Sequence, residues 1–196
     1  MALFLWWFST GAILFLVNWA DNRGKWSHRV ITWGTVPFLF LGLGGVIYTD
    51  GISQTFAVYG AFISALVVWA WLELAFLTGV ITGFNKGNCP ENVNGYERFK
   101  LALGAIVYSE VLLLSVLILL ILCFNNLGTN FGFWTFTLLY GARISAKLNL
   151  FFGVPNINAE FLPKPTQHLA TYFRQDSINK FWPFSVFALS CRVDPY

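Results

Sequence analysis

Five long apolar runs dominate this sequence and limit the folds open to it. They cover residues 2–20, 30–48, 55–81, 101–124 and 131–152. Each run is close to the roughly 20 residues that a helix needs to cross the hydrocarbon core of a bilayer. We therefore predict an all-α, polytopic transmembrane helix bundle of about five passes over residues 1–153. A cytoplasmic or interfacial tail is expected over residues 154–196.

The positions of the basic residues predict the orientation of this bundle. The connections after the second and fourth runs contain no Lys or Arg, whereas the other connections and the tail are basic. Short basic loops are retained in the cytoplasm. The N-terminus should therefore lie outside and the C-terminus inside. The basic residues are Arg23, Lys25 and Arg29, then Lys86, Arg98 and Lys100, then Arg143, Lys147, Lys164, Arg174, Lys180 and Arg192.

Composition argues against a soluble or nucleic-acid-binding protein. Hydrophobic residues make up 57% of the chain and charged residues only 11%, which leaves little for a separate soluble domain. The net charge of +3 is spread over several segments. Contact with anionic membrane lipids explains it better than a nucleic-acid partner.

Charged residues inside the apolar runs are the candidate site. Glu73 and Glu110 lie in the third and fourth runs, and Arg143 and Lys147 lie in the fifth. Charged groups at membrane depth usually face the bundle interior and pair. We expect Arg143 to hold Glu110 or Glu73 through two parallel hydrogen bonds, with Lys147 reaching toward the headgroups. A structural ion pair is favoured over a proton relay or polar substrate path.

No motif points to catalysis or to a bound metal. His28 and His168 fall outside the expected membrane helices, so haem or bacteriochlorophyll has no intramembrane histidine ligand. The cysteines show no CxxC spacing, and the usual hydrolase and nucleotide-binding motifs are missing. We expect a protein that is not an enzyme and has no metal site.

The remaining segments give local expectations. Residues 82–97 should be irregular, because Gly, Asn and Pro dominate them. Residues 166–173 should form an interfacial amphipathic helix that Thr166 caps and that shows Leu169, Ala170 and Phe173 on one face. The glycines of the second run should let helices approach closely; they are Gly42, Gly44 and Gly45.

Several blocks of the sequence resemble one family. The most specific are AKLN at 146–149, GVPN at 153–156, FLP at 161–163, HLATYFR at 168–174 and FWPFSV at 181–186. Further agreement lies in WWFSTG at 6–11 and in the surroundings of Glu73 and Arg143. This pattern resembles the photosynthetic complex assembly protein 2 family of purple phototrophic bacteria, the E protein of the puh operon.

The resemblance implies a function and a set of residues. It implies a multi-pass protein of the bacterial inner, intracytoplasmic photosynthetic membrane that helps reaction-centre and light-harvesting complexes assemble without catalysis. Bacteriochlorophyll or carotenoid held by those complexes is the cofactor it suggests. A permanent accessory subunit and a small transporter or pigment carrier remain alternatives. Relatives continue with further passes, whereas this chain stops at Tyr196. The matching positions are Glu73, Glu110, Arg143, Lys147, Asn149, Pro155, Asn156, Asn158, Glu160 and Pro163.

Overall fold

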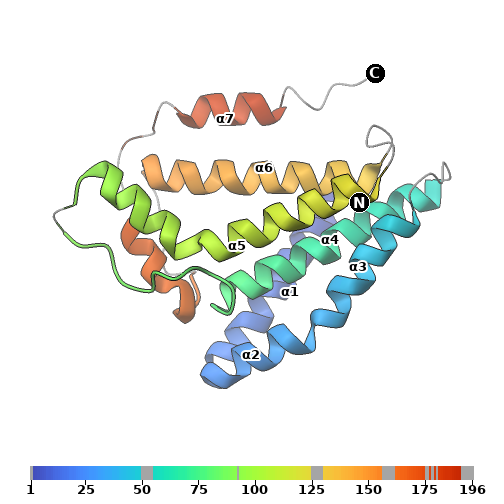
Figure 1. Cartoon of the computed structure of the whole chain (residues 1–196), viewed down its shortest axis with the longest axis horizontal. Coiled ribbons are helices and arrows are strands. Elements are labelled where there is room, and N and C mark those ends of the chain that lie inside the picture. Colours follow the sequence, from blue (N-terminus) through green and yellow to red (C-terminus); the bar gives the residue numbers. More distant parts are fainter. Residues whose placement is uncertain are drawn as a thin grey trace.

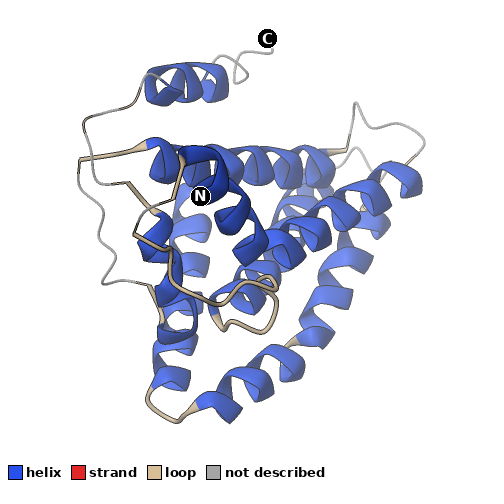
Figure 2. Cartoon of the chain, turned by 60° about the vertical axis from the view of Figure 1, so that its left-hand side comes forward, coloured by secondary structure: helices blue, strands red, loops and turns tan. Residues whose placement is uncertain are grey.

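The chain folds into a bundle of helices (Figure 1). The computed structural model describes residues 2–49, 55–91, 93–124, 130–155, 162–174, 177, 179 and 181–190. Every regular element of this described part is a helix (Figure 2), which confirms the predicted all-α class. The elements are α1 (Ala2–Asp21), α2 (Lys25–Gly34), α3 (Val36–Tyr48), α4 (Thr55–Leu77), α5 (Gly95–Cys123), α6 (Phe131–Phe152), the 3-10 helix η3 (Lys164–Tyr172) and α7 (Phe181–Ser190).

The helix α4 is the centre of the bundle and contacts α1, α2, α3, α5, α6 and η3. It is apolar on all sides, as expected of a helix surrounded by others. Its residues Val68, Trp69 and Leu72 pack in the main core against α3, α5 and α6. The ring of Trp69 meets that of Phe136 on α6 edge-on, with centroids 5.9 Å apart. The site residue Glu73 is thus carried by the most enclosed helix.

Among the described residues, three helical stretches are long and apolar enough to cross a membrane. They are Trp26–Tyr48, which combines α2 and α3, then Thr55–Leu77 and Gly95–Cys123. The predicted count of about five passes is not confirmed. The helix α6 carries Arg143, Lys147 and Asn149 among its apolar residues.

Helix boundaries differ from the predicted ones where glycine or proline intervenes. The second run is two helices that meet at Thr35, because Pro37 lacks an N–H and its ring crowds the preceding turn. The third run stops at Leu77 rather than residue 81. There Gly79 adopts a φ of 71°, the left-handed conformation that commonly ends a helix. The predicted bounds of the fifth run, residues 131–152, are the observed bounds of α6.

The glycines of α3 confirm the expected close helix approach at two of three positions. A Cβ on Gly42 would lie 2.8 Å from Cγ2 of Val68 and 2.9 Å from the carbonyl oxygen of Ser64, and one on Gly45 would overlap Ser64. A Cβ on Gly44 would meet nothing within 4 Å. Gly42 and Gly45 therefore lie where α3 and α4 approach most closely, and Gly44 does not.

The loop after α4 folds back along α5. The amide of Asn85 donates to the carbonyl of Gly104 at 3.2 Å, and the amide of Ser109 donates to the carbonyl of Thr82 at 3.0 Å. Gly83 lies against the α5 backbone so closely that a Cβ would be 2.5 Å from the carbonyl carbon of Ala105. The axis of α5 bends in Figure 1, as helices do when an outside group enters their hydrogen-bond ladder.

The tail packs on the bundle through η3 and α7. The predicted α-helix over 166–173 is instead a 3-10 helix over Lys164–Tyr172 that buries Thr166, Leu169 and Tyr172. That spacing of three follows from the three residues per turn of a 3-10 helix. Thr166 does not cap it, since its hydroxyl donates to the carbonyl of Pro163. The buried face packs against Phe76 and Ala105, so this segment docks on the protein.

Candidate functional site

The two acids and two bases singled out in the apolar runs lie together between α4, α5 and α6. Arg143 on α6 donates from Nη1 to Oε1 of Glu73 on α4. Its Nε lies 3.6 Å from Oε1 of Glu110 on α5. Lys147, one turn beyond Arg143, lies with Nζ 2.6 Å from the same oxygen of Glu110. We call these four side chains the charge cluster.

The geometry of the charge cluster differs from the expected one in two ways. Arg143 does not grip one carboxylate with two parallel hydrogen bonds but reaches toward both acids. Lys147 bonds Glu110 instead of extending toward the headgroups. The four charges alternate in sign and cancel, and each side chain is at least three-quarters buried. Opposite charges in this arrangement offset the cost of removing each one from water.

Aromatic rings enclose the cationic half of the charge cluster. The guanidinium carbon of Arg143 lies 4.5 Å from the ring centroid of Phe76, and Nζ of Lys147 lies 4.3 Å from it. The ring of Trp69 is 6.0 Å from the same guanidinium carbon. Such cation–π contacts strengthen when water is excluded. Phe76 therefore helps to hold both cations in place, and Trp69 helps to hold Arg143.

An apolar cavity of about 410 Å³ borders the charge cluster between α5, α6 and η3. Glu110 and Lys147 are the charged residues of its lining. The rest is mostly aliphatic and aromatic, including Ile106, Leu148 and Phe173. Its chemistry suits a hydrocarbon chain more than a polar substrate.

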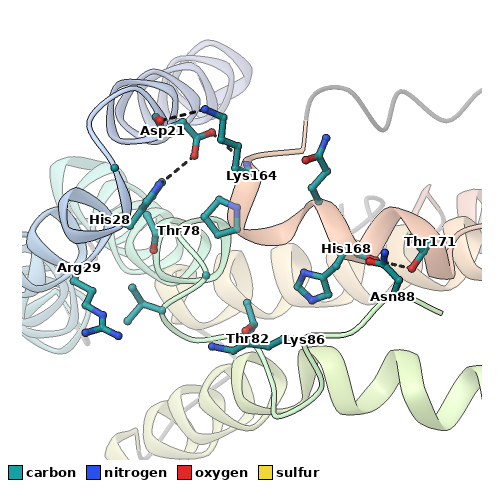
Figure 3. Close-up of a pocket in the computed structure, with 15 residues that line it drawn as sticks. Asp21, His28, Arg29, Thr78, Thr82, Lys86, Asn88, Lys164, His168 and Thr171 are labelled. Carbon is teal, nitrogen blue, oxygen red and sulfur yellow. Dashed lines mark hydrogen bonds and ion pairs between the residues drawn. The ribbon is translucent and has the colours of Figure 1, made fainter. Parts of the chain in front are cut away.

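A second, polar cavity of about 990 Å³ lies where α2, the end of α4 and η3 meet (Figure 3). We call it the interface cleft. Arg29, Lys86 and Lys164 supply cationic side chains, and Asp21 is the acid in its lining. Oδ1 of Asp21 lies 3.1 Å from Nε2 of His28, and Oδ2 accepts a hydrogen bond of 3.4 Å from the amide of Lys164 (Figure 3).

The position of His28 corrects the expectation that both histidines lie outside the membrane helices. His28 belongs to α2, lies within the stretch Trp26–Tyr48 and is 5% exposed. The helix α2 begins at Lys25, five residues before the apolar run. The run did not include these residues because the first turn of the helix is mostly polar. The spacing of Asp21 and His28, seven residues apart across a Gly24 turn, was the signal available in the sequence. His168 lines the same cleft from η3.

The family-motif residues that are described act mainly as structural contacts. Nδ2 of Asn149 donates to the carbonyl of Ser145 and to Oγ of Ser185, both at 3.0 Å, and so joins α6 to α7. Pro163 is buried and precedes η3. Pro155 follows the end of α6. Asn156, Asn158 and Glu160 lie outside the described residues.

Comparison with known proteins places the chain in a family. The family described as "Protein of unknown function (DUF3623)" matches residues 1–194. The chain belongs to this family. It is also 43% identical over 196 residues to a protein of Rhodobacter capsulatus described as "Uncharacterized 30.4 kDa protein in puhA 5'region". That alignment covers 98% of this chain and 72% of the relative. No solved structure matches the chain.

These matches support the predicted link with the puh operon. They do not test the narrower resemblance to the photosynthetic complex assembly protein 2 family. The relative is described by its position beside puhA, and neither description states an activity. Within the described residues, no group of three or more His, Cys, Asp and Glu side chains is arranged to hold a metal ion. The charge cluster offers an alternating set of paired charges, which suits helix positioning more directly than covalent chemistry.

Proposed function

We propose that this member of the DUF3623 family is an integral membrane factor that assists the assembly of bacteriochlorophyll-containing reaction-centre and light-harvesting complexes without catalysis. The observation that carries the proposal is the 43% identity to a protein encoded in the puhA 5′ region. The blocks shared with the assembly protein 2 family point to the same process. Three helices able to cross a membrane suit a factor that meets its clients within the bilayer.

The charge cluster supports a scaffolding role. Both carboxylates already have a cationic partner on another helix, so α4, α5 and α6 are joined by specific contacts at membrane depth. A proton relay or transport path would be expected to show polar lining along its length. The cavity beside the charge cluster is almost entirely apolar instead. Its apolar lining would suit a lipid or pigment tail of a client complex.

The proposed location is the bacterial inner, intracytoplasmic photosynthetic membrane, with the N-terminus periplasmic and the C-terminus cytoplasmic. Support comes from the basic residues, which border the cytoplasmic ends of the expected passes under this orientation only. In this arrangement the interface cleft and the tail face the cytoplasm. Labelling of single cysteines at Arg23 and Lys86 with a membrane-impermeant reagent tests it. Labelling from the periplasm would contradict the orientation.

The decisive experiment is a gene deletion in the source bacterium with complementation. Absorption spectra of the membranes should show fewer assembled complexes in the deletion strain, and the wild-type gene should restore them. The variant Glu73→Gln/Arg143→Gln should restore them poorly. The matched control is Gly44→Ala, because a methyl group at this position contacts no other atom. Unchanged spectra after deletion would contradict the proposal.

A permanent accessory subunit is the second candidate, and the outer surface favours it. Phe4, Trp7, Phe8 and Phe15 of α1 are each at least 60% exposed, an apolar face available to lipid or to a neighbouring helix. Quantitative co-purification separates the two roles. Stoichiometric recovery with mature complexes indicates a subunit, whereas recovery only with immature complexes indicates an assembly factor. For a transporter, the Glu73→Gln/Glu110→Gln variant should abolish a measured flux.

A further inference from the structure

We propose that the interface cleft binds the phosphate headgroup of an anionic phospholipid. Its volume of about 990 Å³ exceeds the 410 Å³ of the apolar cavity beside the charge cluster. No residue of the charge cluster lines it. Its cationic residues come from three segments distant in sequence: Arg29 from α2, Lys86 from the loop before α5, and Lys164 from η3. The fold therefore assembles a basic site that no single segment contains.

The charges of the interface cleft are not balanced internally. The carboxylate of Asp21 faces His28 and the amide of Lys164. Across the described ranges, neither Arg29 nor Lys86 forms an ion pair, although both line the same space. An anion entering the cleft would meet two cations without an acidic partner. The guanidinium group of Arg29 can bind two phosphate oxygens in parallel, and an ammonium group such as that of Lys86 adds a point charge.

Buried polar groups show that the cleft is more than a surface patch of lysines. Nδ1 of His28 and Nε2 of His168 are buried, and neither has a hydrogen-bond partner in the described part of the chain. Thr78 and Thr82 on its wall are almost fully buried as well, but the hydroxyl of Thr78 already donates to the carbonyl of Leu74. Buried polar atoms normally have partners. The two imidazole nitrogens are therefore the groups for which a ligand with acceptor oxygens would supply a partner.

The position of the cleft identifies the source of the phosphate. Arg29 lies near the start of the stretch Trp26–Tyr48, Thr78 follows Thr55–Leu77, and Lys86 precedes Gly95–Cys123. Two of the stretches able to cross a membrane thus reach the cleft at one end, and the loop that leads to the third also lines it. That level corresponds to the headgroups, whichever side of the membrane it occupies. Basic pockets between membrane helices are a known form of anionic lipid site.

The test is lipid binding by the full chain in nanodiscs made of phosphatidylcholine with and without phosphatidylglycerol. Native mass spectrometry would count the phosphatidylglycerol molecules retained. The cleft variant is Arg29→Gln/Lys86→Gln, and the matched control is Arg23→Gln/Lys100→Gln. Both control residues are exposed basic residues outside the cleft, so the two variants lose equal charge. Circular dichroism verifies that each variant is folded.

The proposal expects wild type and control to retain phosphatidylglycerol equally, and the cleft variant to bind it roughly fivefold more weakly for each charge removed. Equal retention by cleft and control variants would overturn it. Stabilisation by inorganic phosphate in pure phosphatidylcholine nanodiscs, without any phosphatidylglycerol effect, would overturn the lipid assignment in favour of a soluble phosphate. If the double variant fails to fold, Lys86→Gln alone, in an exposed loop position, gives the same comparison with Lys100→Gln.

Discussion

Arg143 on α6 donates a hydrogen bond to Glu73 on α4, a residue 70 positions earlier in the chain. Arg143 is 9% exposed, and its guanidinium group also faces Glu110 on α5. One side chain therefore connects the central helix of the bundle to two others. The consequence is that the helices cannot shift along one another without separating charges at membrane depth.

The first prediction concerns the relative weight of the two cations. Arg143→Ala should lower the free energy of unfolding by about 3–5 kcal/mol, because it leaves the carboxylate of Glu73 buried without a partner. Lys147→Ala should cost less, about 1.5–3 kcal/mol, since Glu110 still faces Arg143. Chemical denaturation in detergent micelles measures both. Equal losses in the two variants would contradict the pairing.

The second prediction concerns the contact between α3 and α4. Gly42→Ala should destabilise the protein by about 1–3 kcal/mol, because the added methyl group overlaps Val68 and the Ser64 carbonyl. Gly44→Ala is the control, since its methyl group enters open space, and it should not lower the unfolding midpoint. A similar drop in both variants would show that helix flexibility, and not close packing, explains the glycines.

The third prediction concerns the loop that lies on α5. Gly83→Ala should release the loop from Gly104 and Ala105, since no side chain can move to accept the added carbon. Hydrogen exchange at the Ser109 amide should accelerate, because its bond to the Thr82 carbonyl depends on this approach. Gly87→Ala, in the same loop, has a nearest neighbour at 3.5 Å and should exchange as wild type does. Unchanged exchange in Gly83→Ala would contradict the docking.

The fourth prediction concerns pH. Burial lowers the pKa of His168 from its usual 6.5, and the nearby Lys86 lowers it further against a hydrogen bond to the Pro165 backbone. The unfolded chain therefore takes up this proton at a higher pH than the folded chain does. Stability from this residue is complete above pH 6.5 and declines as the pH falls through that value. Thermal unfolding midpoints at neutral and mildly acidic pH measure the decline.

The matched variant for this pH effect is His168→Gln, which should show a smaller loss of stability on acidification. Asp21, His28, Lys86 and Lys164 line the same cleft and are present in both proteins. Their contributions cancel in the comparison. An identical loss in wild type and variant would mean that His168 does not titrate in this range.

The sequence predicted the features that depend on composition and periodicity. The bounds of α6 and the charged residues within the apolar runs were predicted in this way. Long apolar runs and isolated charged residues can be recognised in a sequence without any tertiary information. The close approach at Gly42 and Gly45 also follows from residue size. The pairing of particular charges was left open between Glu73 and Glu110, and the structure has Arg143 facing both.

Features that depend on tertiary contacts were not predictable. The break at Thr35 and the end of α4 at Gly79 are local, but their effect on direction depends on the neighbouring helices. The burial of His28 requires that α1 and α2 fold back on each other. The 3-10 geometry of η3 buries Tyr172 beside Leu169 against Phe76 and Ala105, while Phe173 stays partly buried on the same cluster.

The short helix η3 separates the apolar cavity from the interface cleft. Its residues Leu169 and Tyr172 line the apolar cavity beside Glu110 and Lys147, while His168 and Thr171 line the interface cleft. A sideways displacement of η3 would therefore enlarge one of these cavities and narrow the other. The same nine residues therefore set the width of both cavities.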